Sequence, residues 1–447
     1  MIRSNWISTL GAAVATVAAM GLVTTLALEG RQGWDSPYLG LLTVVLLPLV
    51  TLGGLLLIPF GLLLYRRQLA ARIEALSDRP MRTARAVVML TAVNFLAVGT
   101  AGYSGAEYLS SQQFCGKACH KIMWPEAEAA RSSPHANVQC VQCHVGEGAQ
   151  GFIHAKLNGV AQLLGTFRND YHRPIPTPVE DLPPTKAICE RCHSPRRYLG
   201  TKLVVKTHFE PNEKNTGFVN VLLMRRGGEL PGGRVAGIHW HAHPSSNVEY
   251  LPGDVRRRTI PWVRARFPDG RVEVYAAEGF QSEPDSAQLR RMDCTDCHNR
   301  VGHQFATAEE VVDGAMATGL IPRHVPFIRK KAAEVLQQPW TREGAAAGIR
   351  AAVTKVLAGT AATPDELQRT AEALSSGWLR NNDPDRKLEW GSYPTFTAHD
   401  GCFRCHDNKH KNAKGEPIAS KCSTCHVVLS ERQENPAVLE TLGIRPK

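Results

Sequence analysis

The chain has 447 residues, a formal net charge of +11 at pH 7, 43% hydrophobic residues, 12 cysteines and 17 histidines. This composition excludes a disordered, collagen-like or coiled-coil chain, and the length allows two or three domains. A positive charge often indicates nucleic-acid binding, but it has to be located before it is interpreted. Every cysteine lies at or beyond Cys115, whereas long apolar stretches are confined to the first hundred or so positions.

Three stretches near the N-terminus contain no charged side chain: residues 4–28, 36–65 and 86–106. Each reaches the roughly 20 residues that a helix needs to cross a bilayer core of about 30 Å. The second stretch contains Pro48 and Pro59, which transmembrane helices tolerate. A buried soluble hairpin is the alternative, and for the first stretch alone a cleaved signal peptide. Three such runs in succession favour a three-helix transmembrane anchor over residues 1–106.

The loop between the second and third stretches fixes the predicted orientation. It is rich in arginine, whereas the loop between the first two has only Arg31; the arginines are Arg66, Arg67, Arg72, Arg79, Arg82 and Arg85. Because positively charged loops stay in the cytoplasm, the N-terminus is predicted to be cytoplasmic and the chain from Glu107 onward to lie on the opposite face. In a bacterium this is a multi-pass protein of the inner membrane whose large domain is periplasmic.

The twelve cysteines form six pairs, and each pair is followed directly by a histidine. Five pairs have the spacing Cys-x-x-Cys-His: Cys140, Cys143 and His144; Cys189, Cys192 and His193; Cys294, Cys297 and His298; Cys402, Cys405 and His406; Cys422, Cys425 and His426. The first pair has one residue more, with Cys115, Cys119 and His120. We number these motifs 1 to 6 in chain order.

This spacing suits covalent attachment of haem c. Two thiols one helical turn apart add to the two vinyl groups of a haem, and the next imidazole becomes the proximal iron ligand. Zinc would not require a histidine after every second cysteine, a thioredoxin-like pair would occur once, and structural disulfides would be spaced irregularly. Six haems are predicted. Their propionates add about a dozen negative charges, which offset most of the net positive charge and remove the argument for nucleic acid.

The fold predicted from these features is a membrane-anchored multihaem cytochrome c with little regular structure in its haem-packed part. A small β region is expected at about 201–280, with a hairpin around Pro268-Asp269-Gly270. A small helical region is expected at about 305–382, where Thr307 and Thr363 begin capping boxes. The predicted domains are residues 1–106, 107–303 and 304–447.

Low-spin haems need a second axial ligand, and eleven histidines remain once the proximal ones are assigned. Ser132-Ser-Pro-His135 before motif 2, and His303 after motif 4, resemble the NapC/NirT/NrfH family of membrane-anchored multihaem quinol dehydrogenases. The resemblance covers about residues 104–303. It implies that His135 binds the haem of His193, that His303 binds the haem of His144, and that Met123 is the candidate ligand of the first haem.

The same resemblance implies a quinol site beside the first haem. Lys156 resembles the quinol-site lysine of the family, and Asp170 could supply a carboxylate. The larger layout, with three membrane helices and two additional haems, is similar to the ImcH-type inner-membrane cytochromes. This likeness makes His208, His239, His241 and His410 candidate distal ligands, followed by His399.

The sequence therefore predicts an inner-membrane quinol dehydrogenase that passes electrons from menaquinol, or another quinol, through six haems to a periplasmic acceptor or redox partner. Two alternatives remain. One is a terminal reductase of a small oxyanion such as nitrite, which the absence of a Cys-x-x-Cys-Lys motif makes less favoured. The other is a passive electron-transfer or anchor subunit that meets quinol only through a partner. The three helices could also dock another membrane subunit or a second copy of the chain.

Overall fold

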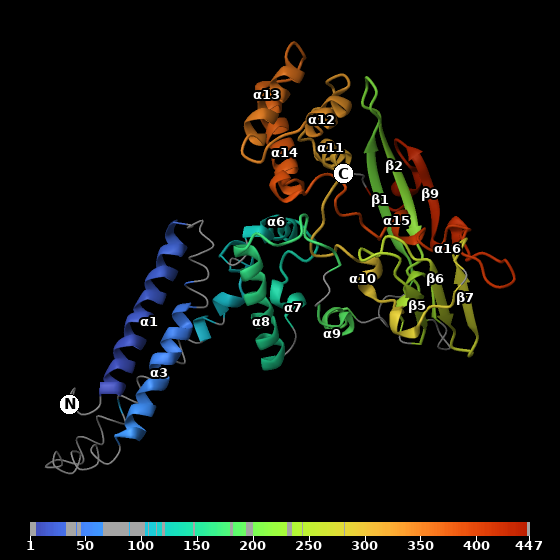
Figure 1. The fold of residues 1–447 in the computed structure, drawn as a ribbon. Coiled ribbons are helices and arrows are strands. Elements are labelled where there is room, and N and C mark those ends of the chain that lie inside the picture. The colour runs from blue at the N-terminus through green and yellow to red at the C-terminus, as the bar shows by residue number, and fades with distance from the viewer. Residues whose placement is uncertain are drawn as a thin grey trace. The chain divides into compact units, whose positions relative to one another are not determined.

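The computed structural model describes residues 6–32, 42, 46–65, 89, 103–105, 107–112, 114–118, 121–145, 148–178, 182–193, 200–229, 235–243, 245–280 and 282–444. The chain divides into two compact units (Figure 1). The first contains Met1–Trp124 and Gln139–Tyr171, and the second contains Pro125–Val138 and His172–Lys447. The three domains expected from the sequence stay a prediction.

Two apolar helices of the first unit, α1 (Trp6–Gln32) and α3 (Leu47–Leu64), pack against each other. Small residues make this contact, since a Cβ on Gly11 would lie 2.7 Å from the Gly54 carbonyl oxygen. The Ser8 hydroxyl donates a hydrogen bond of 2.7 Å to the Ile58 carbonyl oxygen. Close packing of small residues and hydroxyl bonds are typical of helix pairs in membranes, where lipid is as apolar as the side chains.

Among the described residues, α3 is the one helix long and apolar enough to cross a membrane, with a mean hydropathy of 2.3. Within α1, Trp6–Leu22 is a shorter apolar stretch. The side chains of Leu55, Leu56 and Leu63 are exposed, which suits a surface that contacts lipid. The third predicted span, residues 86–106, falls largely outside the described residues, and the arginine-rich loop entirely so. The three-helix anchor is therefore still a prediction.

Short helices make up the rest of the first unit. They are η2 (Phe114–Ala118), η3 (Lys121–Met123), α7 (Cys140–His144) and α8 (Gly148–Phe167). The helix α6 (Trp124–Arg131) follows η3 and runs into the second unit. With 20 residues, α8 is the longest helix here after α1.

The strands of the second unit form three sheets. In the first, β1 (Lys202–Phe209), β2 (Gly217–Met224) and β9 (His426–Gln433) are antiparallel in the order β1-β2-β9. The second pairs β3 (Gly228–Glu229) with β4 (Val235–Ala236). The third has the order β7-β6-β5-β8, from β5 (Asn247–Leu251), β6 (Trp262–Arg266), β7 (Val272–Ala276) and β8 (Arg290–Arg291). Since β6 and β7 pair antiparallel, the predicted hairpin around Gly270 is confirmed.

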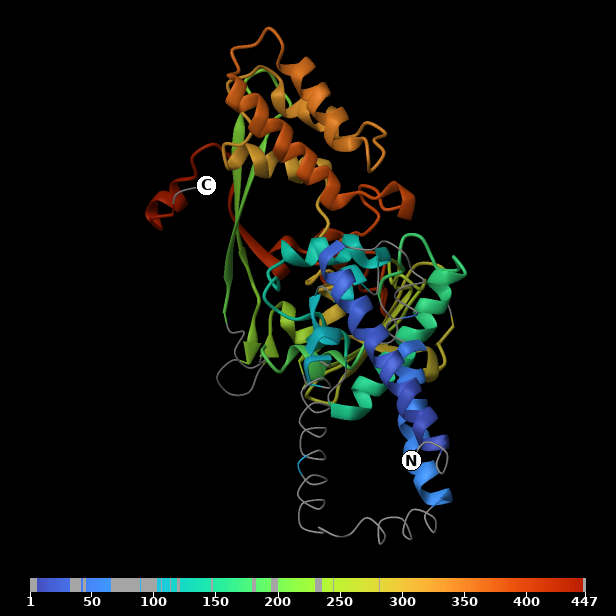
Figure 2. The same ribbon diagram turned by 90° about the vertical axis from the view of Figure 1, so that its left-hand side faces the viewer.

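Four helices form the main apolar core of the second unit: α11 (Ala308–Ala317), α12 (Ile328–Leu336), α13 (Ala345–Leu357) and α14 (Pro364–Asn381). Both predicted capping boxes are confirmed, at Thr307 before α11 and at Thr363 before α14. Figure 2 shows these helices at one end of the long β1–β2 hairpin. Phe209, the last residue of β1, is buried in their core.

The remaining elements of the second unit are short. They are α9 (Thr185–Cys189), η5 (Ile238–Ala242), η6 (Ser286–Gln288), α10 (Cys294–Cys297), η7 (Pro384–Arg386), α15 (His399–Cys402), α16 (Cys422–Cys425) and α17 (Ala437–Thr441). Irregular chain connects them, as predicted for a domain that packs around haems.

We expect the helical core to be stable without help from the haems, since it consists of packed side chains. Ile349 on α13 is fully buried, so Ile349→Ala should cost about 2–5 kcal/mol of unfolding free energy. Amide hydrogen exchange should speed up across α11–α14 while the haem absorbance stays unchanged. The exposed neighbour Arg350, changed to Ala, is the matched control. Equal exchange in the two variants would contradict this account of the core.

Candidate haem-binding site

Each regular Cys-x-x-Cys-His motif either contains a short helix or starts at the last residue of one. Motif 2 is α7, motif 4 begins with α10, and motif 6 begins with α16. Motifs 3 and 5 follow the same rule, because α9 ends at Cys189 and α15 ends at Cys402. One helical turn brings the two cysteines of a motif to the same side, as attachment to one haem requires.

Motif 1 differs in its backbone as well as in its length. Cys115 lies in η2, a π-helical turn over Phe114–Ala118. A π turn contains one residue more than the corresponding α turn, so it can accommodate the residue inserted between the two cysteines. Cys119 and His120 lie outside the described residues.

Four of the six proximal histidines face a second histidine in the second unit. The ring centroids are 5.9 Å apart for His135 and His193, 6.4 Å for His239 and His298, 5.9 Å for His241 and His406, and 6.1 Å for His399 and His426. Two imidazoles on opposite sides of one metal ion have centroids about 6 Å apart, because each metal–nitrogen bond is about 2 Å and the ring nitrogen lies about 1 Å from the centroid. The observed gaps therefore fit an iron between each pair.

Hydrogen bonds orient several of these rings for coordination. A metal-bound histidine usually donates its second ring nitrogen to a carbonyl oxygen, which leaves the other nitrogen for the metal. Three of the rings have such a contact through Nδ1. The distance from Nδ1 to the backbone carbonyl oxygen is 3.3 Å for His135 and Val301, 2.8 Å for His241 and Ile238, and 2.6 Å for His406 and Ala419. In each case the bond through Nδ1 leaves Nε2 available for the metal.

Burial favours the neutral, iron-binding form of three of the facing rings. Burial lowers the pKa of His239 and of His241, and neighbouring positive charge lowers both further. Burial also lowers the pKa of His298, with contributions from His193 and Lys202. Neutral imidazole is the required ligand, so the environment favours coordination over protonation.

The cysteines of consecutive motifs lie close together. The thiols of Cys189 and Cys294 are hydrogen-bonded, which joins motif 3 to motif 4, and the same contact joins Cys115 of motif 1 to Cys140 of motif 2. Cys402 of motif 5 lies within electrostatic range of Cys297 in motif 4 and of Cys425 in motif 6. Motifs 3, 4, 5 and 6 thus follow one another in space as they do in the chain.

The element η5 contributes to two of these sites. It carries His239, which faces motif 4, and His241, which faces motif 5. In the same way α15 carries both Cys402 of motif 5 and His399, which faces motif 6. A single short helix therefore fixes the spacing between neighbouring sites.

Two predicted ligands have other partners. His208 lies on β1, where its Nδ1 is 3.3 Å from an Asp313 carboxylate oxygen and its ring packs on Phe218. His410 is buried, with Nδ1 bonded to Asp407 at 2.9 Å and Nε2 to the Ile260 carbonyl at 2.6 Å. Both nitrogens of His410 are occupied, so this arrangement disfavours it as an iron ligand.

The remaining predicted ligands belong to the first two haems. The Nδ1 atom of His303 lies 2.8 Å from the Glu126 carbonyl oxygen, the same bonding that the facing rings show. Its predicted partner His144 ends α7 in the other unit, so this pairing rests on the family resemblance. Met123 ends η3, directly after the part of motif 1 that lies outside the described residues.

The predicted quinol residues both belong to the first unit. Lys156 lies in the middle of α8, with its side chain outside the described residues. Asp170 is exposed beyond the end of this helix, where its N–H donates to the Gly165 carbonyl at 2.8 Å. Eleven helical residues separate Lys156 from the end of α8, which is about 16 Å along the axis. This distance argues against both side chains binding one hydroxyl group.

A buried ionic network between motifs 4 and 5 has no counterpart among the residues singled out from the sequence. Its centre is Asp296, inside motif 4, whose carboxylate accepts hydrogen bonds from Tyr250 at 2.6 Å and Arg257 at 2.9 Å. Arg404, inside motif 5, donates to the carbonyl oxygens of Asp296 and Arg257. The sequence carries one sign of this network: the residue before the second cysteine is acidic in motif 4, Asp296, and basic in motif 5, Arg404.

Comparison with known proteins agrees with this geometry. The pattern of the NapC/NirT cytochrome c family, N-terminal region, matches residues 79–175. The cytochrome c-type protein ImcH of Geobacter sulfurreducens is 34% identical over 455 residues, which cover 96% of this chain and 89% of that protein. The chain belongs to the ImcH-type cytochromes of the NapC/NirT family. No solved structure matches the chain.

As a NapC/NirT cytochrome, the chain is a membrane electron-transfer protein with covalently bound haem c. The described residues fit that cofactor, because the cysteines of motifs 4, 5 and 6 form no disulfide and a histidine faces each proximal ring of motifs 3 to 6. Burial raises the pKa of the Cys297 and Cys405 thiols to about 12, so both sulfurs lie in surroundings that suit neutral thioethers. The haem supplies reversible one-electron chemistry.

The facing pairs predict the effect of removing a distal ligand. His241→Ala and His399→Ala should each convert one haem from low spin to high spin, because one axial position of the iron loses its nitrogen. Electron paramagnetic resonance and the absorbance bands of the oxidised protein measure this change. His208→Ala is the control and should leave every haem low spin. A spin change in His208→Ala, with none in His241→Ala, would contradict the pairing.

Proposed function

We propose that this protein is a quinol dehydrogenase of the bacterial inner membrane, which transfers electrons from menaquinol or another quinol through six haems to a periplasmic redox partner. The observation that supports it most directly is the row of histidine pairs along motifs 3 to 6. A chain that carries electrons over a distance needs closely spaced redox centres with saturated coordination. Family membership supports the general part of this proposal, namely that the chain is an electron-transfer cytochrome at a membrane.

The same pairs disfavour an oxyanion reductase. A reductase of nitrite needs an iron with one open coordination position for its substrate. In the second unit the facing rings fill both sides of the four sites at motifs 3 to 6. The weakest ligand in the predicted set, Met123, belongs to the first haem, beside which we propose that quinol binds.

The proposed topology follows from charge and hydropathy. The apolar helix α3 ends at Leu64, directly before the arginine-rich loop that starts at Arg66. Arginine-rich loops stay in the cytoplasm, so one further crossing by residues 86–106 would bring motif 1 to the periplasmic face. The N-terminus is then cytoplasmic and the haem region periplasmic, as attachment of haem c to all six motifs requires.

Quinol oxidation releases two electrons and two protons. Since each haem accepts one electron, the two electrons leave the quinol in separate steps, and both protons need an acceptor near the membrane surface. We assign the contact with the quinol hydroxyl to Lys156 on α8, which belongs to the same compact unit as α1, α3 and motif 1. Asp170 is exposed beyond the far end of the same helix, so in this proposal a proton reaches it through intervening water before release to the periplasm.

Electrons leave the proposed path at motif 6. This motif ends the row of neighbouring cysteines, and Cys422 is itself exposed. The strand β9 that begins at His426 exposes Val428 and Leu429 beside it. A small exposed apolar surface next to the last haem suits a short-lived contact with a redox partner.

The test is reduction by quinol of the purified, detergent-solubilised protein with its haems. A menaquinol analogue should reduce the haems rapidly, and Lys156→Ala should slow this by at least tenfold while haem content stays the same. Stopped-flow absorbance at the haem bands measures the rate. Gln162→Ala, an exposed change on the same helix, should behave as the unchanged protein does.

Two outcomes would contradict the proposal. If dithionite reduces every haem and quinol reduces none, the quinol site belongs to another subunit and the chain is a passive electron wire. If quinol reduces the haems equally fast in Lys156→Ala, the site is not at this lysine.

A further inference from the structure

Three consecutive arginines, Arg256 to Arg258, lie in a tight loop between β5 and β6. The carboxylate of Asp254 holds this loop by accepting hydrogen bonds from the Arg256, Arg258 and Thr259 N–H groups at 2.8 to 3.2 Å. Burial raises the pKa of Asp254, but these hydrogen bonds outweigh it and leave the pKa below its ordinary value. The loop conformation is therefore fixed by its own backbone bonds.

The central arginine of the three forms an ion pair in the protein interior. Arg257 has a left-handed backbone with a φ of 54°, which costs about 1–2 kcal/mol for a residue with a Cβ. Its guanidinium donates to the buried Asp296 carboxylate at 2.9 Å. The ion pair offsets the backbone strain, and it makes Arg257 part of the buried network around Asp296.

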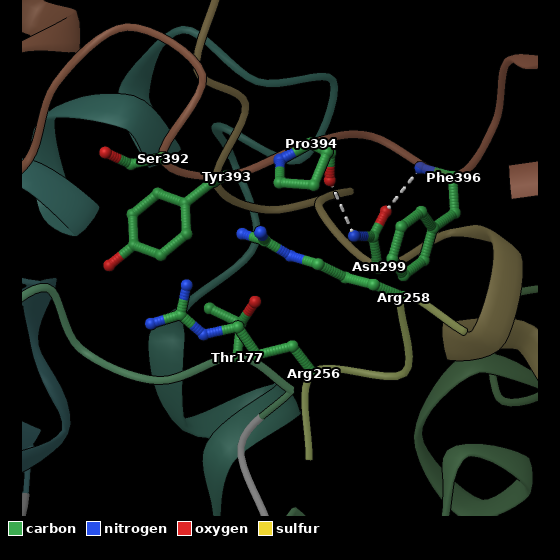
Figure 3. Close-up of a pocket in the computed structure, with 8 residues that line it drawn as sticks. All are labelled: Thr177, Arg256, Arg258, Asn299, Ser392, Tyr393, Pro394 and Phe396. Atoms are coloured by element: carbon green, nitrogen blue, oxygen red, sulfur yellow. Dashed lines mark hydrogen bonds between the residues drawn. The ribbon is translucent and has the colours of Figure 1, made fainter. Parts of the chain in front are cut away.

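The two outer arginines line a cavity instead. Figure 3 shows the Arg256 and Arg258 side chains extending toward Tyr393, between Thr177 and Asn299. The cavity has a volume of about 10 Å³, which is about the room of one water molecule. It can therefore receive only the end of a carboxylate-bearing group, and it is too small for a whole haem.

The cavity carries positive charge without a matching carboxylate. None of the eight residues that line it is acidic. Within the described structure, no carboxylate pairs with Arg256 or Arg258, whereas Arg257, Arg264, Arg290 and Arg300 all have one. The Asp254 carboxylate contacts the backbone of both arginines, and Glu126, which bonds to Tyr393, already lies 3.4 Å from Arg300. Two guanidinium groups aimed at one small space are a recognition site for a carboxylate.

Neighbouring residues connect this cavity to the haem motifs. Asn299 directly follows the proximal His298 of motif 4. Its amide donates to the Pro394 carbonyl at 2.9 Å and accepts from the Phe396 N–H at 2.9 Å. The Phe396 ring packs under the guanidinium of Arg404 in motif 5, 4.1 Å from the ring centroid. The cavity wall is thus built from residues that touch two attachment sites.

We propose that Arg256 and Arg258 bind a carboxylate in this cavity, and that this carboxylate is a propionate of a haem attached beside it. The inference needs covalent haem, which family membership provides, but it does not depend on quinol as the electron donor. Two cations on a propionate stabilise its charged form and raise the electron affinity of that haem relative to its neighbours. The arginines would therefore set the potential of one step in the row of haems.

The test is a redox titration, followed by haem absorbance, of the haem-loaded protein carrying Arg256→Gln and Arg258→Gln together. We expect the electron affinity of one haem to fall at least tenfold relative to the others, which is about 59 mV for one electron. The pKa of its propionate should rise, so the potential of that haem should become pH-dependent closer to neutrality. Haem content and the potentials of the other haems should stay unchanged.

Matched variants keep the result interpretable. Arg350→Gln with Lys355→Gln removes the same charge from α13 and should shift no potential. If the glutamine pair fails to load haem, Arg256→Lys with Arg258→Lys keeps the charge, and its potentials should stay near those of the unchanged protein. Unaltered potentials in a fully loaded glutamine variant would overturn the proposal. So would a large shift in the lysine variant.

The alternative to a propionate is a small carboxylate from solution that binds in the same cavity. Adding acetate distinguishes the two. With the cavity already filled by a propionate, added acetate should not change the haem spectrum or the thermal stability of the unchanged protein. A saturable effect of acetate that disappears in the glutamine variant would overturn the propionate assignment and identify a site for a small carboxylate from solution.

Discussion

Axial coordination of iron is the constraint on which this structure depends. Each proximal histidine is fixed by its motif, so the fold must bring a second imidazole to within about 6 Å of it from a distant part of the chain. His135, His239, His241 and His399 meet that requirement for motifs 3 to 6. Three of these four histidines, His239, His241 and His399, come from the chain between motifs 3 and 5, so this region positions distal rings as well as forming sheets and helices.

Buried polar contacts join the attachment sites of motifs 4 and 5. Asp296 and Arg404 occupy the same position in motifs 4 and 5, and Arg404 donates directly to the Asp296 carbonyl and to the carbonyl of Arg257, whose guanidinium binds the Asp296 carboxylate. Breaking a buried network of this kind leaves an uncompensated charge, so its geometry is strongly specified. The extensive apolar core lies elsewhere, in α11–α14. A smaller apolar cluster that includes Val248, Tyr250 and Val263 packs against Cys405 of motif 5, so apolar packing and ion pairs act together at the attachment sites.

Local patterns were predictable from the sequence, and long-range pairings were not. The motif spacing, the capping boxes at Thr307 and Thr363, and the hairpin at Gly270 all depend on residues within one turn or one loop. The partner of each proximal ring depends on tertiary packing across up to 165 residues, as between His241 and His406, so His410 resembled a ligand although both its nitrogens are bonded. Arg256 and Arg258 gave no periodic signal, because the left-handed turn at Arg257 decides where they point.

The central claim is that four irons lie between the facing rings in the order of motifs 3, 4, 5 and 6. A cryo-electron microscopy structure of the haem-loaded protein in detergent tests it most directly, because iron is the strongest feature of such a map. We predict one iron between each of the pairs His135 and His193, His239 and His298, His241 and His406, and His399 and His426. An iron bound by His208 or His410, or a row in a different order, would contradict the account.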